Sequence, residues 1–129
     1  MTACVLDASA LLAMLRAEPG GERVTPLLGD AVMSTVNLAE VAAHYIRNGT
    51  PESAAREILS SLQVAWVEFD EEQAYSTAAM LPASRAYGLS FGDRACLALA
   101  RRLGLPAVTA DRVWATAAAA LGVDVTLIR

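Results

Sequence analysis

The sequence predicts an α/β fold, a three-layer α/β/α sandwich around a short, mostly parallel five-stranded sheet. Its 129 residues are 55% hydrophobic and 19% charged, which suits one compact domain spanning residues 1–129. Alanine supplies 27 residues and leucine 17, whereas aromatic residues make up 5%, so helices should pack through small aliphatic side chains. Short apolar runs alternate with segments of helical period, an order typical of parallel strands joined by right-handed crossovers.

The predicted strands are short apolar runs that end at polar or turn residues. The first closes with Val5 and Leu6 and stops at Asp7, and the last has Asp124 near its start. Trp66 lies in the third strand, and we expect it to pack in the core. From the second onward, the expected strands are residues 31–33, 64–69, 106–110 and 123–128.

Helix signals fill the intervals between these strands. Ser34 or Thr35 is expected to cap one helix, and Thr50 another. Ser90 and Asp93 have the spacing of a capping box, which makes the helix they begin the best signalled. Glycines or Gly-containing pairs end most of the helices. The expected helical segments are residues 8–17, 24–28, 35–48, 71–84, 90–103 and 112–121, and a further helix is expected to begin at Pro51.

Charge and residue usage exclude several classes of protein. All ten basic residues are Arg, so mechanisms that need a lysine amine are excluded. The net charge of -4 disfavours a polyanionic ligand unless bound cations or a local Arg cluster reverse the field. Cys4 and Cys96 have no metal-binding spacing and are expected to be buried thiols. The apolar amino-terminal stretch contains Asp7 and follows no basic residue, so we expect neither a signal peptide nor a membrane span, and a cytoplasmic location.

Carboxylates follow the strands in a pattern that points to a site. Asp7 and Asp111 come directly after the first and fourth strands, and Asp93 lies in the first turn of the helix that leads into the fourth. Helix starts and strand ends share one edge of a parallel sheet, so these three residues and Glu40 are expected at the same edge, where open α/β sheets bind ligands.

Carboxylates gathered at one edge repel one another unless one is protonated or a cation lies between them. Oxygen ligands without paired His or Cys prefer Mg²⁺ or Mn²⁺ to Zn²⁺. Two divalent cations would bring the formal charge of -4 to about zero, which would remove the objection to a polyanionic substrate.

Ordinary helix capping explains each Asp singly, at about 1 kcal/mol each. Spacing alone therefore leaves a shared metal site and three independent caps both open. Glu40 has weaker support because Asn37, His44 and Arg47 share its helix face, a pattern typical of a solvated stripe. Without a second imidazole or a nucleophile to pair with, His44 is expected to be a surface or half-buried residue.

Neighbouring polar residues have supporting roles as hypotheses, each with a structural alternative. Ser9 and Thr109, two residues from Asp7 and Asp111, could orient a carboxylate, although local hydrogen bonding and β-propensity also explain them. Arg94 and Arg112 each follow an acidic residue and could meet a phosphate, but a solvated helix face or an ion pair is the more common role. Trp114 is expected in the core.

Four segments together resemble the PIN-domain ribonucleases, and most closely the VapC-type toxins of toxin–antitoxin systems. They are VLDASALLA, NLAEV, LSFGDRACLALAR and TADRVW, and the resemblance covers essentially the whole chain. It implies an α/β/α sandwich and an acidic pocket formed by Asp7, Glu40, Asp93 and Asp111, with Ser9 beside it. A further acidic residue expected shortly after the fourth carboxylate is missing, because residues 114–116 are Trp, Ala and Thr. That departure leaves the second metal ion open.

The resemblance also implies an activity and partners. These are Mg²⁺- or Mn²⁺-dependent RNA endonuclease activity that leaves a 5′-phosphate and a 3′-hydroxyl, a homodimer, and inhibition by a cognate antitoxin protein. The alternative is a non-catalytic PIN-like interaction module in which the same acids cap helices. A phosphatase with Asp7 as nucleophile lacks the usual second acid, since Ser9 stands there, and lacks a Lys. A receiver domain fails for the same missing Lys.

Overall fold

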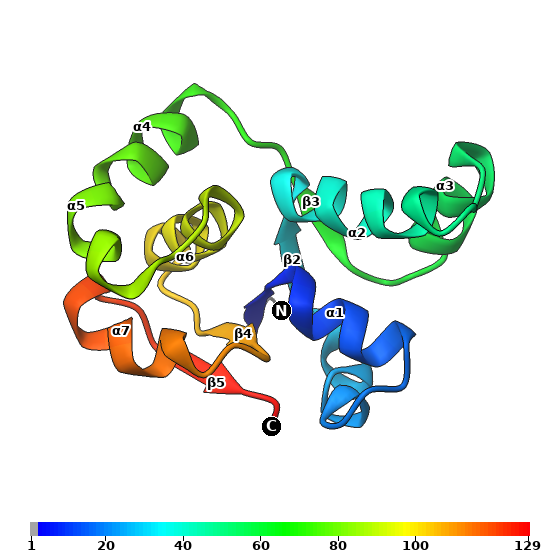
Figure 1. The fold of residues 1–129 in the computed structure, drawn as a ribbon, viewed down its shortest axis with the longest axis horizontal. Coiled ribbons are helices and arrows are strands. Elements are labelled where there is room, and N and C mark those ends of the chain that lie inside the picture. Colours follow the sequence, from blue (N-terminus) through cyan, green and yellow to red (C-terminus); the bar gives the residue numbers. More distant parts are fainter. Residues whose placement is uncertain (1–2) are drawn as a thin grey trace.

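A sheet of five strands, all parallel, forms the centre of the protein (Figure 1). The computed structural model describes residues 3–129. The strand order is β3-β2-β1-β4-β5, as expected when the chain first winds one way from β1 and then returns to the other side of it. The strands are β1 Cys4–Leu6, β2 Ala31–Ser34, β3 Ala65–Val67, β4 Ala107–Thr109 and β5 Val125–Leu127.

Helices cover both faces of this sheet, so the predicted α/β/α sandwich is confirmed (Figure 1). One face carries α1 Ala8–Leu15, α2 Thr35–Arg47 and α3 Glu52–Ser60. The other carries α6 Phe91–Leu103 and α7 Val113–Leu121, while α4 Glu71–Ala79 packs against α6 and α5 Leu81–Ser84 packs against α7. Short 3₁₀ helices complete the chain at η1 Gly21–Arg23, η2 Thr25–Asp30 and η3 Arg85–Tyr87. No helix in the described range 3–129 has the length and apolar character to cross a bilayer.

Alternating strand residues divide the core into two clusters. Leu6 and Met33 face the α1–α3 side, whereas Val5 faces the α6 and α7 side. Both cysteines are buried free thiols as predicted, and burial raises their pKa. Trp114 is fully buried as predicted, and Trp66 is only partly buried against the α1–α3 cluster.

The helix boundaries confirm most capping predictions. Ser34 caps α2 through its Oγ, which accepts the Val36 N–H at 3.1 Å. The Ser90–Asp93 capping box is present at the start of α6, and Gly104 ends that helix with φ of 65°.

Two local predictions were wrong. The helix expected over residues 71–84 breaks at Met80, whose buried side chain packs against the α6 and α7 cluster; Pro82 also lacks the N–H that a continuous helix would require. Thr50 does not cap α3, because the helix begins at Glu52 with Pro51 in the capping position. The short helical piece expected at residues 24–28 is present as the 3₁₀ helix η2, which Val24 precedes.

Candidate functional site

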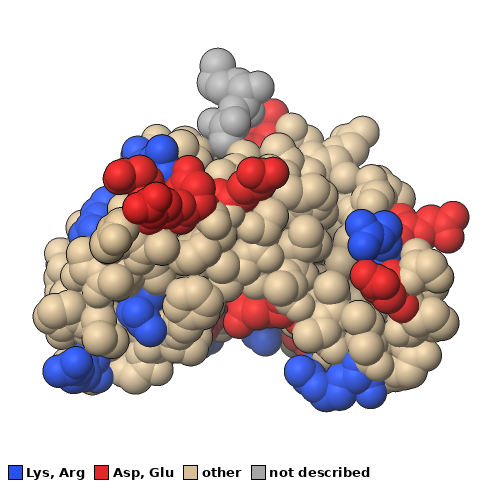
Figure 2. Space-filling model, turned by 90° about the horizontal axis from the view of Figure 1, so that it is seen from above, with Lys and Arg blue, Asp and Glu red and all other residues tan. Residues whose placement is uncertain are grey.

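The acidic residues singled out from the sequence lie at the edge where the strands end. Asp7 directly follows β1 and Asp111 lies two residues after β4, and these neighbouring strands flank the point where the strand order reverses. Asp93 lies in the first turn of α6. On this side of the molecule, Figure 2 shows a notch in the lower outline that contains acidic side chains and has basic side chains on both flanks.

Asp7 is held by a network of hydroxyl groups. Its carboxyl is buried, with 4% of the residue exposed, and Oδ2 accepts hydrogen bonds from Ser9 Oγ at 2.6 Å and Thr109 Oγ1 at 2.8 Å. Each hydroxyl in turn accepts a backbone N–H, from Ala110 for Ser9 and from Asp111 for Thr109. The network joins the start of α1 to the segment after β4, and it places Ser9 and Thr109 where the sequence predicted carboxylate-orienting groups.

The environment of Asp7 disfavours its charged form. Burial raises the Asp7 pKa to about 6, the two hydroxyl donors oppose that rise, and the nearby Asp93 and Glu40 carboxylates add to it. No salt bridge pairs Asp7 with a basic side chain within residues 3–129. An ionised Asp7 therefore lacks a compensating positive charge, which a bound cation would supply.

Glu40 is positioned by Asn37, which the sequence had placed on a solvated stripe. That interpretation is wrong for Asn37, which is fully buried and donates through Nδ2 to Glu40 Oε1 at 2.8 Å and to the Gly92 carbonyl at 3.0 Å. Gly92 gives the Glu40 carboxylate room, since a Cβ there would collide with it. The signal available in the sequence was an Asn one helical turn before a Glu.

Asp93 and Asp111 do have the structural roles that the capping interpretation assigned to them. Asp93 Oδ2 accepts the Ser90 N–H at 2.9 Å, and Asp111 Oδ1 accepts the Val113 N–H at 3.0 Å near the start of α7. Asp7 differs, because its side chain makes no capping hydrogen bond to α1. Capping therefore accounts for two of the three Asp side chains and leaves Asp7 unexplained.

The carboxylate oxygens at this edge are of the kind that bind hard cations, although the side chains are not arranged as a metal-binding group. Within residues 3–129, no three His, Cys, Asp or Glu side chains form a group poised to hold a metal ion. Asp93 and Glu40 are nevertheless near enough to Asp7 to help raise its pKa, and the ligand atoms of all three are carboxylate oxygens. The buried Asn37 Oδ1 has no hydrogen-bond partner in the described part of the chain and adds a further oxygen beside Glu40. These groups fit Mg²⁺ or Mn²⁺ in kind and charge.

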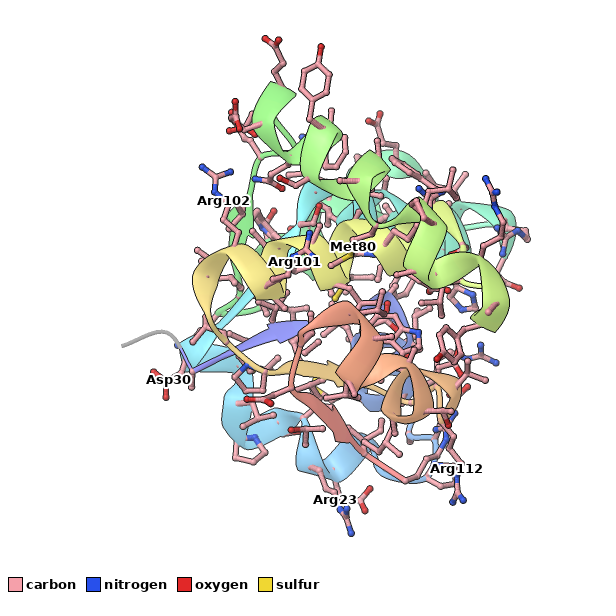
Figure 3. All side chains as sticks on the ribbon, turned by 90° about the vertical axis from the view of Figure 1, so that its left-hand side faces the viewer. Arg23, Asp30, Met80, Arg101, Arg102 and Arg112 are labelled. Atoms are coloured by element: carbon pink, nitrogen blue, oxygen red, sulfur yellow. The ribbon has the colours of Figure 1, made fainter. Side chains whose placement is uncertain are left out.

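The two arginines proposed as phosphate contacts differ in position. Arg94 is half-buried, with its guanidinium carbon 5.9 Å from the centre of the Phe91 ring. Arg112 is exposed just before α7, and Figure 3 shows it away from Asp30, which precedes β2 at the opposite edge of the sheet. In the described range, neither arginine forms a salt bridge. His44 is half-buried with its ring edge-on to Tyr45, and it remains outside the site described here.

Comparison with known proteins identifies the family. The model of the PIN domain family matches residues 4–120, which is most of the chain. The chain belongs to the PIN-domain family. No curated protein matches it significantly.

Solved structures share this PIN fold at low sequence identity. The DNA-bound VapBC of Salmonella typhimurium has a TM-score of 0.77 and 16% identity over 100% of both chains. A toxin–antitoxin complex from Klebsiella pneumoniae has a TM-score of 0.75 and 16% identity over 98% of both chains. VapC20 of Mycobacterium tuberculosis, described as a sarcin-ricin loop cleaving toxin, has a TM-score of 0.74 and 20% identity over 89% of this chain and 95% of its own. The PIN domain thus has a VapC-like fold.

Proposed function

We propose that this PIN domain is a divalent-metal-dependent RNA endonuclease and the toxin of a toxin–antitoxin pair. The observation that carries the proposal is Asp7, a buried carboxyl without a cationic partner among residues 3–129, held at the switch point of the sheet with Asp93 and Glu40 close by. A protein selected only for stability gains little from such a group, because burying an uncompensated charge is costly. Binding a cation would compensate the charge of this carboxylate cluster.

Asp7, Glu40, Asp93 and Asp111 would hold the ion, with Mg²⁺ as the expected species and Mn²⁺ as its substitute. Ser9 and Thr109 fix the orientation of Asp7 by donating to the same oxygen. Asn37 fixes Glu40 in the same way from within α2. These donors hold the carboxylates in place before a ligand arrives, which reduces the reorganisation needed on binding.

Phosphodiester hydrolysis suits this arrangement because it needs charge neutralisation more than a side-chain base. A divalent cation, when bound, supplies Lewis acidity that favours attack by water and stabilises charge on the phosphoryl oxygens. Arg94 and Arg112, which lack carboxylate partners in the described range, are placed to contact flanking phosphates. The products expected for this reaction class carry a 5′-phosphate and a 3′-hydroxyl.

The proposed partners are RNA, a cognate antitoxin protein and a second copy of the chain, with a cytoplasmic location. An apolar groove between α2 and α3, with a volume of about 270 Å³, offers a surface for the antitoxin. The fold similarity to toxin–antitoxin complexes supports such a partner. The groove is lined chiefly by Leu38, Ala42, Ile46, Ala55, Leu59 and Trp66.

The second candidate is a non-catalytic PIN-like interaction module. It is favoured by the hydrogen bonds that give Asp93 and Asp111 structural roles. It does not account for the buried Asp7, and for that reason the nuclease is the preferred proposal.

Cleavage of a mixed RNA pool by the purified protein tests the proposal. Cuts should require Mg²⁺ or Mn²⁺, stop with chelator and be lost in Asp93→Asn, whose amide oxygen can still accept the Ser90 N–H and preserve the helix cap. Asp124→Asn is the matched control, because exposed Asp124 precedes β5 at the opposite edge of the sheet. Full activity of Asp93→Asn would refute the assigned site, and RNA left intact under all conditions would favour the interaction module.

A further inference from the structure

An exposed aromatic side chain lies beside the carboxylate cluster without a role in it. Phe91 is the first residue of α6 and is 51% exposed, an unusual state for a phenylalanine. Phe69, in the segment after β3, meets it edge to face, with ring centres 5.7 Å apart and an interplanar angle of 84°. Phe69 is itself anchored, because its N–H donates to Thr35 Oγ1 at the start of α2. The Phe91 ring is therefore braced in place while much of its surface remains open.

The positively charged side chain of Arg94 lies next to the Phe91 ring. The guanidinium carbon of Arg94, one turn along α6, lies 5.9 Å from the ring centre, within cation–π range. Arg94 forms no salt bridge within residues 3–129. The protein has a net charge of -4, so the positive charge of Arg94 next to the exposed Phe91 ring is a local exception. A ligand that is both anionic and aromatic would be attracted to this pair.

The pair is contiguous with the proposed catalytic edge. Phe91 adjoins Gly92, against which the Glu40 carboxylate packs, and it precedes Asp93 by two residues. A ligand on the Phe91 ring would therefore extend from the carboxylates toward the end of β3. A nucleotide has the required parts, because its base can stack on the ring while its phosphate meets Arg94.

We propose that Phe91, braced by Phe69 and flanked by Arg94, is a stacking platform for an unpaired base of single-stranded RNA next to the cleaved phosphate. This inference rests on the proposed nuclease function and deepens it by assigning a positioning residue. Base stacking is tolerant of sequence, so the platform holds the strand at the carboxylate cluster without dictating which base is bound.

The test is RNA binding followed by fluorescence quenching. A random-sequence single-stranded RNA carrying one 2-aminopurine is titrated in Mg²⁺ with the Asp93→Asn protein, which keeps the probe intact. Adding Phe91→Ala should abolish the quenching and weaken binding by about tenfold or more. Phe91→Tyr should restore both, because it retains the ring. Leu103→Ala, which truncates an exposed apolar side chain at the other end of α6, should change neither.

In the cleaving protein, Phe91→Ala should raise KM more than it lowers kcat. Unchanged quenching and affinity in Phe91→Ala would overturn the inference. If Phe91→Ala instead binds RNA as well as before but no longer forms a dimer, Phe91 is a protein contact, and the inference is also overturned. Cleavage by the wild type with a KM indifferent to Phe91→Ala would refute the platform alone. Phe91-dependent stacking without any cleavage would support the platform and refute the nuclease. A wild-type protein that neither binds nor cuts RNA would refute both.

Discussion

Replacing Asp7 by Asn should stabilise the metal-free protein at neutral pH. The Asp7 pKa of about 6 lies above its ordinary value of 3.8, a difference equivalent to about 3 kcal/mol against the ionised folded state. Because the folded-state pKa is the higher one, protonated Asp7 contributes its full stability below pH 3.8, and that contribution is lost as the pH rises through about 6. Asn keeps the amide oxygen that can accept from Ser9 and Thr109 and removes the charge.

The assay is urea unfolding of wild type and Asp7→Asn in chelator across pH 4 to pH 7.5. The informative quantity is the difference between the two unfolding free energies, since other carboxyl groups titrate equally in both proteins. Between pH 4 and pH 7.5 this difference should change by about 2.4 kcal/mol in favour of the variant, because part of the contribution of Asp7 is already lost at pH 4. Added Mg²⁺ should then stabilise the wild type and leave the variant nearly unchanged. A difference that stays constant with pH would refute the argument that Asp7 is held in an environment hostile to its charge.

Two further substitutions test the groups that position the carboxylates. Gly92→Ala should destabilise the protein in urea unfolding and reduce cleavage, because the new Cβ would collide with the Glu40 carboxylate. The control is Gly29→Ala, whose Cβ would make only an ordinary contact and whose effect on the unfolding free energy should be neutral or stabilising by up to about 1 kcal/mol. Equal effects of the two substitutions would contradict this role for Gly92. Thr109→Val removes a donor to Asp7, so the Asp7 pKa should rise further above 6 in a carboxyl-carbon NMR titration, and an unchanged pKa would show that the hydroxyl contributes nothing.

The sequence predicts the fold and the sheet edge at which the candidate carboxylates lie. Strand and helix alternation, the capping box at Ser90 and the glycine at position 104 each act locally, so they can be recognised without knowledge of tertiary contacts. The edge follows from topology, because strand ends and helix starts coincide in a parallel sheet. For that reason the sequence alone groups Asp7, Asp93 and Asp111 at one edge.

Tertiary contacts decided the features that were missed. Asn37 was placed on a solvated stripe because helical periodicity does not say which neighbour covers a face, and here the start of α6 covers it at Gly92. The break at Met80 likewise depends on a buried side chain that packs against other helices. No sequence pattern distinguishes Phe91, whose exposure and contact with Phe69 are visible only in the folded structure.

Calorimetric titration of Mn²⁺ into the metal-free protein at pH 6, in two buffers of different ionisation enthalpy, tests the central claim most directly. If Asp7 is a ligand with a pKa of about 6, binding at this pH must release about half a proton from it, and the release should shrink at pH 7.5. Asp7→Asn should bind far more weakly and release less. The same affinity in Asp7→Asn, or no Mn²⁺ binding by the wild type, would contradict a metal site built on these carboxylates.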